Sequence, residues 1–294
     1  MKNGVIVALF FLASAAYSQQ DAQKDLNALV VQDTAKAPQY GWKHSVVGGL
    51  TLGQVSFTDW AQGGENSLSY GLMVGGKSEL NKERTNWSNS YKFAFGQTRL
   101  SSQGLRKTDD EISLETLFRY KLQPEFGLYA SATLQTQFAN GYRYETDGTA
   151  IPISSFFDPA YLTQSIGVVY TPIPEIITRV GPALREVVTS TYYGYADDPK
   201  TADIEKVRVQ AGLESVTGVR WELMENVLFT MRLSIFMPFD DPGRMVVRND
   251  NGLAVKVGKA VTMMLTTQIW VDPDVSPRTQ LKESIALGLS YNFF

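Results

Sequence analysis

The feature that most constrains the fold of this chain is a strict alternation of apolar and polar residues, which holds from Trp42 almost to the end. In the segment 125–138, EFGLYASATLQTQF, Phe126, Leu128 and Leu134 fall on one face. Serine, threonine and glutamine fall on the opposite face. A period of two residues is the period of a β-strand. The chain is therefore predicted to be all-β.

The alternating segments have the number and spacing of an up-and-down antiparallel barrel. Each has ten or more residues, which is long for a soluble strand and typical of a tilted strand that crosses a membrane. Short and long connections alternate along the chain, as in a barrel with turns at one end and loops at the other. We expect twelve strands, and an even number places both termini on the periplasmic side. The predicted strands are 43–57, 67–80, 84–97, 109–121, 125–138, 160–171, 175–188, 206–223, 226–238, 244–258, 260–272 and 281–293.

Two soluble folds also show this alternation of apolar and polar residues along their strands. Three features of the sequence favour a membrane barrel over both. A β-sandwich would have two cores, and a lipocalin-like barrel would turn its apolar face inward. Here charged residues recur in mid-strand, where a water-filled lumen suits them, and aromatic residues gather near strand ends, as at a membrane interface. The ending ESIALGLSYNFF, with Phe294 last, looks like the C-terminal signal that outer-membrane assembly machinery recognises. Its strand is expected to pair with the first, which leaves no edge exposed to lipid.

The N-terminal segment and the composition limit the domains and partners. Residues 1–18 have the basic start, apolar core and small residues of a secretory signal peptide. We expect a flexible periplasmic extension over 19–41 and the barrel over 42–294, in contact with outer-membrane lipid and lipopolysaccharide. The absence of cysteine excludes disulfides, a thiolate nucleophile and a lipidated cysteine. A net charge of −3 offers no basic surface for nucleic acid, and no cofactor is indicated.

The polar faces of the strands are the predicted lining of the lumen, and they carry more basic than acidic residues. The balancing acids lie in predicted external loops, among them Asp272 and Asp274. Such a lumen would favour anions. The alternative is that the charges pair across neighbouring strands and fill a narrow barrel. The candidate lumen residues are Lys92, Arg119, Arg208, Glu214, Arg232, Arg248, Asp250 and Lys256.

The first long connection carries a second unusual motif. Its glycine pair permits a tight turn, and its acidic and amide side chains can accept hydrogen bonds from backbone amides. The motif is either an ordinary turn with an interfacial tryptophan or a gating or ligand-binding element. Its residues are Asp59, Trp60, Gly63, Gly64, Glu65 and Asn66.

Metal and catalytic sites are not predicted. The acidic loop segments DDP and DPD could bind calcium, but Asp-Pro is also an ordinary turn former. His44 is the only histidine, so a zinc site lacks ligands. Outer-membrane phospholipases use a serine and a histidine on the lipid-facing wall, but no serine in a nucleophile motif accompanies His44, and we expect no enzyme.

Three segments carry a resemblance to a known family: WKHSVVGGLTLGQVSFTDWAQGGENSLSYG, NDNGLAVKVGKAVTMMLTTQIWVD and LKESIALGLSYNFF. They resemble an uncharacterised family of Bacteroidetes-type envelope proteins of unknown function. Its most specific element is W-x-x-G-G-x-N, here Trp60, Gly63, Gly64 and Asn66. The resemblance implies an outer-membrane setting and no activity.

The sequence therefore predicts a pore for small polar solutes, anions included. The alternative is a non-conducting envelope barrel that acts through its loops or as a subunit of an assembly. A lipid-acting enzyme is a distant third.

Overall fold

The computed structural model describes residues 40–57, 65–101, 103–198, 201–257 and 261–292. Most of them lie in strands. The predictions for the signal peptide 1–18, most of the extension 19–41 and Phe294 fall outside the described residues. Two short 3₁₀ helices are present, η1 (Tyr193–Tyr195) and η2 (Pro242–Arg244). The strands are β1 (Gly41–Val55), β2 (Ser67–Asn81), β3 (Thr85–Leu100), β4 (Gly104–Lys121), β5 (Phe126–Thr136), β6 (Gly141–Tyr144), β7 (Ala150–Ser154), β8 (Ala160–Ile173), β9 (Ile176–Val188), β10 (Val207–Met224), β11 (Val227–Pro238), β12 (Val246–Lys256), β13 (Val261–Val271) and β14 (Gln280–Asn292).

Twelve of these strands form one closed antiparallel ring. Each strand pairs with the next along the chain, except that β5 pairs with β8 because β6 and β7 form a separate hairpin. The ring closes where β14 pairs with β1, with Leu289 opposite Leu50. Closure satisfies the backbone hydrogen bonds that an open sheet would expose to lipid. The predicted twelve-stranded barrel, with its last strand paired to its first, is confirmed.

The alternation assigns one apolar face to the outside and one polar face to the inside. On β14, Ile285 and Leu287 are 78% and 62% exposed, and on β5 Leu128 is 46% exposed. The inward neighbours include buried charged side chains such as Arg179 and Glu214. An exposed apolar belt around a charged interior is the arrangement of a barrel that spans a membrane. No helix among the described residues is long and apolar enough to cross a membrane.

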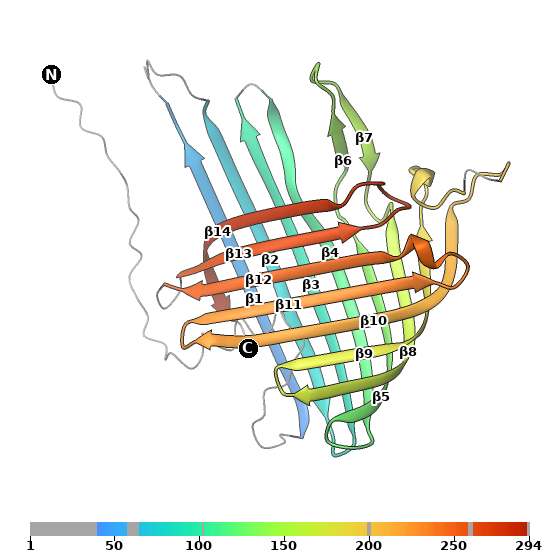
Figure 1. Cartoon of the computed structure of the whole chain (residues 1–294). Coiled ribbons are helices and arrows are strands. Elements are labelled where there is room, and N and C mark those ends of the chain that lie inside the picture. Colours follow the sequence, from blue (N-terminus) through green and yellow to red (C-terminus); the bar gives the residue numbers. More distant parts are fainter. Residues whose placement is uncertain (1–39, 58–64, 102, 199–200, 258–260, 293–294) are drawn as a thin grey trace.

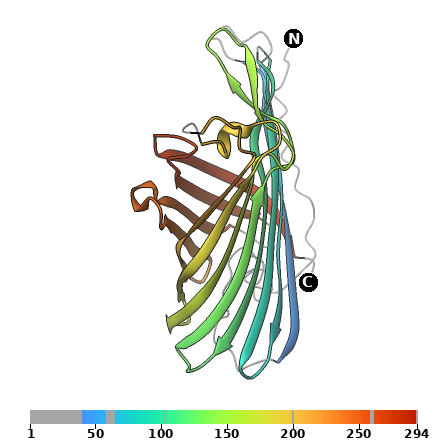
Figure 2. The same ribbon diagram turned by 90° about the vertical axis from the view of Figure 1, so that its right-hand side faces the viewer.

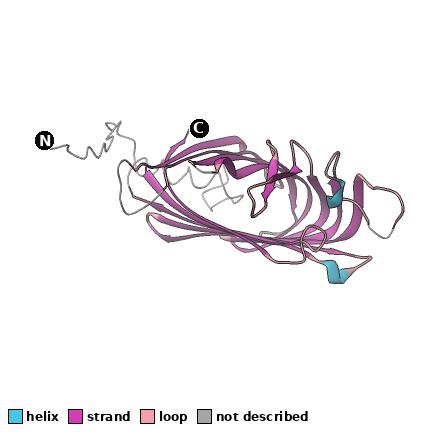
Figure 3. Ribbon diagram, turned by 90° about the horizontal axis from the view of Figure 1, so that it is seen from above, coloured by secondary structure: helices cyan, strands magenta, loops and turns pink. Residues whose placement is uncertain are grey.

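The ring is flattened rather than round. Seen from above, its two broad walls lie close together (Figure 3). In Figure 1 the strands β10–β14 of the front wall cross steeply over β1–β4 of the back wall. Side chains from opposite walls can therefore meet inside the lumen.

The sheet bends from one wall to the other at β8 and β9. Two glycines there allow the backbones of these two strands to approach each other closely. A Cβ atom on Gly181 would lie 1.8 Å from the carbonyl oxygen of Ile166, and one on Gly167 would lie 2.2 Å from that of Val180. No other residue fits without moving the backbone. The pairing is interrupted here, between Ser165 opposite Ala183 and Val168 opposite Val180.

All long connections lie at one end of the ring, which we call the long-loop end; the opposite end is the short-turn end. The hairpin of β6 and β7 extends beyond the long-loop end (Figures 1 and 2). This hairpin, which lies in the stretch predicted to be a loop, was not foreseen. Its residues alternate over too few positions to show a period in the sequence.

The predicted loop between the third and fourth strands is wrong. The strands were expected to end at 97 and to resume at 109, but β3 and β4 remain paired to Leu100 opposite Gly104. Gly104 has φ +72°, which permits the tight turn. The ends of β3 and β4 at the long-loop end lie outside the apolar belt and have no apolar face. The sequence therefore shows no alternation of apolar and polar residues in these ends.

Candidate functional site: the charged lumen

The interior charges of the barrel form ion pairs that cross the lumen. Glu115 on β4 accepts hydrogen bonds from Arg179 on β9, at 2.5 Å, and from both terminal nitrogens of Arg232 on β11, at 2.9 and 3.2 Å. β4 and β11 are not neighbours but belong to facing walls. A two-pronged contact of this kind fixes the guanidinium as well as neutralising it. Glu115 therefore ties three strands together across the interior.

A second crossing lies beside the first and links β4 to β12. Glu111 accepts from Lys92 Nζ at 2.6 Å and from Arg248 Nη2 at 2.8 Å. The other two guanidinium nitrogens of Arg248 also donate hydrogen bonds: Nε donates to Asp250 at 2.8 Å, and Nη1 donates to Gln135 at 2.9 Å. We call the two crossings, centred on Glu111 and Glu115, the central constriction. It places charged side chains across the lumen where a solute would pass.

A third set of ion pairs lies at the long-loop end and uses acids from the connection after β13. Asp272 binds Arg185 of β9 at 2.6 Å, and Asp274 binds Arg208 of β10 at 2.8 Å and Arg244 of η2. Burial alone would raise the pKa of Asp274. The hydrogen bond and charge of Arg208, joined by Arg244, outweigh it and hold the pKa below its ordinary range.

These contacts correct the expected distribution of charge. Asp272 and Asp274 were predicted to be external loop acids that leave the lumen basic, but both fold against lumen arginines. Asp272 continues the inward-facing positions of β13, since it follows Gln268 and Trp270 at steps of two. Asp272 is the last residue of the predicted strand 260–272, so following the alternation to the end of that strand would have found it.

The short-turn end is filled by a polar cluster and an apolar one. Glu79 pairs with Lys77 at 2.6 Å, and Arg119 donates two hydrogen bonds to the side-chain oxygen Oδ1 of Asn86, at 2.6 and 2.9 Å. Nearby on the ring, the buried side chains of Leu117, Tyr129 and Val169 pack together against Ile177. The interior is thus narrowed at this end as well.

Arg220 of β10 is the exception to the pairing. It is 2% exposed, and its three guanidinium nitrogens make no hydrogen bond within the described part of the chain. Its nearest carboxylate, that of Glu222, lies 3.8 Å away and is half exposed. A buried charge with so little compensation is costly.

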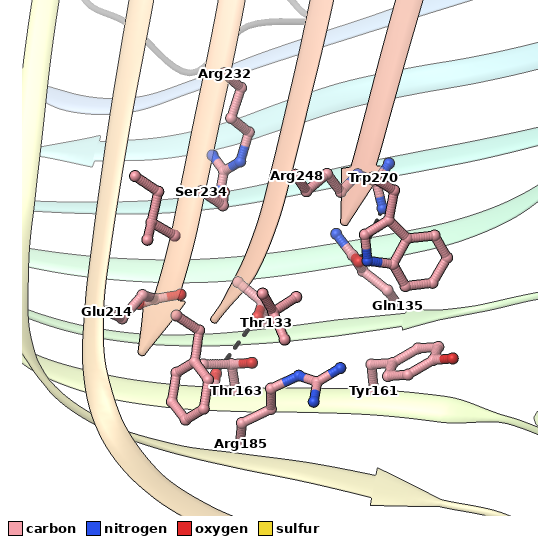
Figure 4. Close-up of a pocket in the computed structure, with 13 residues that line it drawn as sticks. Thr133, Gln135, Tyr161, Thr163, Arg185, Glu214, Arg232, Ser234, Arg248 and Trp270 are labelled. Carbon is pink, nitrogen blue, oxygen red and sulfur yellow. Dashed lines mark hydrogen bonds between the residues drawn. The ribbon is translucent and has the colours of Figure 1, made fainter. Parts of the chain in front are cut away.

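A cavity lies between the central constriction and the long-loop end. It offers about 80 Å³ of space that water can enter. Figure 4 shows side chains from β5, β8 and β9 and from β10 to β13 converging on it, with Glu214, Thr163 and Arg185 at one side and Trp270 and Tyr161 at the other. Its wall carries charged, hydroxyl, amide and aromatic groups: Thr133, Gln135, Tyr161, Thr163, Arg185, Glu214, Arg232, Ser234, Ile235, Phe236, Val246, Arg248 and Trp270.

The predicted lumen residues all lie on the inward-facing positions of their strands. Lys92, Arg232, Arg248 and Asp250 belong to the central constriction or touch it. Of the other four, Glu214 lines the cavity, and Arg208, Arg119 and Lys256 lie toward the two ends. The sequence showed which side chains face inward, but not which of them meet.

The motif of the first long connection is only partly described. Asp59, Trp60, Gly63 and Gly64 lie outside the described residues. Asn66 accepts a hydrogen bond from the Phe57 amide through its side chain at 2.6 Å, and from Ser101 through its backbone oxygen at 3.2 Å. Glu65 adjoins β2. The described part of the motif therefore joins two connections at the long-loop end, as a turn element does.

His44 lies on the outward face and has a serine neighbour that the sequence did not suggest. Its Nδ1 atom is 2.9 Å from Ser78 Oγ, and the ring stacks on Trp42 with centroids 5.6 Å apart. Nucleophilic catalysis needs a further group that orients the imidazole. Within the described residues the structure records no such partner for His44. Nor do these residues hold a cluster of three metal-ligating side chains.

Residues 52–142 match a family of unknown function. The description of that family model is "Protein of unknown function (DUF3078)". The match confirms the expected resemblance over this part of the chain, and it brings no activity with it. No curated protein matches the chain.

Several solved barrels are similar in fold at low identity. The translocator domain of the autotransporter NalP from Neisseria meningitidis is 12% identical, over 92% of this chain and 93% of that chain, with a TM-score of 0.41. The NanC porin is 8% identical, over 83% and 98%, with a TM-score of 0.39. The CymD monoaromatic hydrocarbon channel is 12% identical, over 86% and 88%, with a TM-score of 0.35. None of these likenesses bears on a solute or a mechanism.

Proposed function

We propose that the protein is an integral outer-membrane channel for small polar solutes, with its short turns and both termini on the periplasmic side. The observation that carries the proposal is a closed ring with an apolar exterior whose interior holds paired charges and a polar cavity. In this setting the exterior contacts outer-membrane lipid and lipopolysaccharide. The assembly machinery recognises the C-terminal segment that contains β14.

The central constriction sets the size limit of this channel. The contacts from Glu111 to Arg248 and from Glu115 to Arg232 join facing walls at 2.8 and 2.9 Å. A solute passes only where these side chains leave room or move aside. The channel therefore conducts weakly and excludes large solutes.

The charge pairing argues against a strong preference for anions. Arg208, Arg232 and Arg248 each have a carboxylate partner within 3 Å. A paired arginine attracts a passing anion less than a free one, because the neighbouring carboxylate cancels most of its field. Selectivity is consequently weak.

Single-channel recording in a planar bilayer under a salt gradient tests the proposal. We expect a small conductance with a reversal potential near zero for the wild type. The double variant Glu111→Ser/Arg248→Ser removes one crossing without changing the net charge, and its conductance should be larger. The matched control is Arg143→Ser/Glu145→Ser, which removes an exposed pair of 3.1 Å in the β6–β7 hairpin. If folded wild type and Glu111→Ser/Arg248→Ser are both silent, the channel proposal fails.

A second candidate function is a non-conducting envelope barrel that acts through its loops. The β6–β7 hairpin favours it, because the hairpin extends beyond the ring and exposes Tyr142. Silence in the bilayer together with a partner that co-purifies with the wild type, and is lost when 141–154 is replaced by a short turn, would support this function.

A further inference from the structure

Glu214 is the acidic group of the lumen cavity. It makes no ion pair with a described lysine or arginine, and the charge of Arg232 acts on it only from a longer distance. Glu214 is 7% exposed. Its recorded hydrogen bond comes from Ser165 Oγ at 2.5 Å, and Ser165 in turn contacts Ser131. No described lysine or arginine nitrogen lies within 4 Å of its carboxylate. A buried carboxylate in this position would be stabilised by a cationic group that enters the cavity.

The same cavity wall holds guanidinium groups with donors to spare. A guanidinium has five N–H donors. Arg185 uses two nitrogens, on Gln210 at 3.1 Å and Asp272 at 2.6 Å. Arg232 uses its two terminal nitrogens on Glu115 alone. Their remaining donors are suited to a carboxylate, which guanidinium groups bind in two-pronged fashion.

Neither an anion nor a cation alone matches this wall. A simple anion would meet Glu214 and would compete with the carboxylates already bound to the arginines. A simple cation would meet Arg185, Arg232 and Arg248, which all line the cavity. A solute with both charges satisfies both kinds of group.

The size of the cavity limits that solute to a small one. Its 80 Å³ corresponds to roughly two to three water molecules, at about 30 Å³ for each. Only the smallest organic solutes, of the size of glycine, fit such a space. Tyr161 and Trp270, whose rings meet edge to face at 5.7 Å, and Phe236 supply an apolar surface for a short aliphatic group.

We infer that the cavity binds a small zwitterionic solute of the α-amino acid class. Its ammonium group lies against Glu214 and its carboxylate lies toward Arg185 and Arg232. The inference rests on the proposed function, because it names the class of solute that the channel admits.

Ligand-observed NMR on the refolded full-length protein in detergent micelles tests the inference without a bilayer. The probes are glycine, acetate and methylamine. We expect saturable glycine binding at concentrations up to about 50 mM, since a channel must release its solute readily. Acetate and methylamine should bind at least about tenfold more weakly, because each lacks one of the two charges.

Two variants connect the binding to this cavity. Glu214→Gln should weaken glycine binding about tenfold or more, which is typical of the loss of a buried charge contact. Ser234→Met should abolish it by filling the cavity without changing any charge. The matched control Glu145→Gln, in the exposed β6–β7 hairpin, should bind as the wild type does.

Several results would overturn the inference. Acetate or methylamine binding as tightly as glycine would mean a site for one charge only. Folded wild type without saturable glycine binding, or glycine binding unaffected by Glu214→Gln and Ser234→Met, would mean that the cavity is not the site. A barrel that is silent in the bilayer but binds glycine in micelles would refute the channel and leave the binding site standing.

Discussion

Glu111 and Arg248 meet at 2.8 Å although their strands lie on opposite sides of the ring. Between β4 and β12 lie β5, β8, β9, β10 and β11 in one direction and β3, β2, β1, β14 and β13 in the other. A round ring of this size would keep such side chains apart. The flattening seen in Figure 3 brings them together. The lumen is therefore cross-linked by its own side chains.

Removing Glu115 should destabilise the barrel strongly. Glu115→Gln leaves Arg179 and Arg232 without their carboxylate inside the protein, and breaking a buried ion pair in this way costs about 3–5 kcal/mol. Asp109→Asn is the control, since its pair with Lys282 is nearly half exposed and should contribute about 0–1 kcal/mol. Guanidinium unfolding from lipid vesicles, followed by tryptophan fluorescence, measures both changes. Equal losses in the two variants would contradict a structural role for the central constriction.

Replacing Arg220 should stabilise the barrel. Its buried guanidinium makes no hydrogen bond with the described residues, so Arg220→Met removes a desolvation cost and keeps an aliphatic chain of similar length. We expect the free energy of unfolding to rise by about 1–4 kcal/mol, as when buried ionic groups are replaced by apolar ones. Arg179→Met, which strips Glu115 of a partner at 2.5 Å, should lower it. Equal losses of stability in Arg220→Met and Arg179→Met would contradict the view that the buried charge of Arg220 is uncompensated.

An arginine introduced on the outward face of β14 should destabilise the barrel more than one introduced on the inward face. Ile285→Arg places a guanidinium in the lipid-facing belt, which costs about 2–4 kcal/mol near mid-membrane. Ser284→Arg, one residue earlier, points into the lumen and should cost much less. Refolding yield and unfolding in vesicles compare the two variants. A larger loss for Ser284→Arg would mean that the faces are assigned the wrong way round.

The long-loop end should loosen in acid. Because the pKa of Asp274 is lowered below its ordinary value of 3.8 on folding, its carboxylate stabilises the fold above that pH. This contribution is lost as the pH falls below 3.8 toward the folded-state pKa. The protection of the 272–279 amides against hydrogen exchange, corrected for the intrinsic pH dependence of exchange, should fall over this range in the wild type. Asp274→Asn should show fast exchange already at neutral pH, whereas Asp240→Asn, an exposed loop control, should behave as the wild type. Corrected protection in the wild type that does not change over this pH range would contradict the role of Asp274.

The sequence alone determined the strands, their order and the face of each side chain. A period of two is a local property, so Phe126 and Leu128 could be assigned to the same face of their strand without knowing any neighbour. The alternation also placed all eight predicted charged residues on the inner face. It failed where no apolar face exists, as between Leu100 and Gly104 and in the β6–β7 hairpin.

Only the tertiary structure decided which charges meet and what space they leave. Glu115 and Arg232 are far apart in sequence, and the shape of the ring determines whether facing walls approach. The flattening, and the close approach of the chain at Gly181, follow from contacts between strands that no local pattern encodes. The sequence left open whether the lumen charges attract anions or pair with one another. In the structure most of them are paired, many across facing walls, and Glu214 faces a small cavity. Local alternation specifies faces, whereas pairing across a lumen depends on global shape.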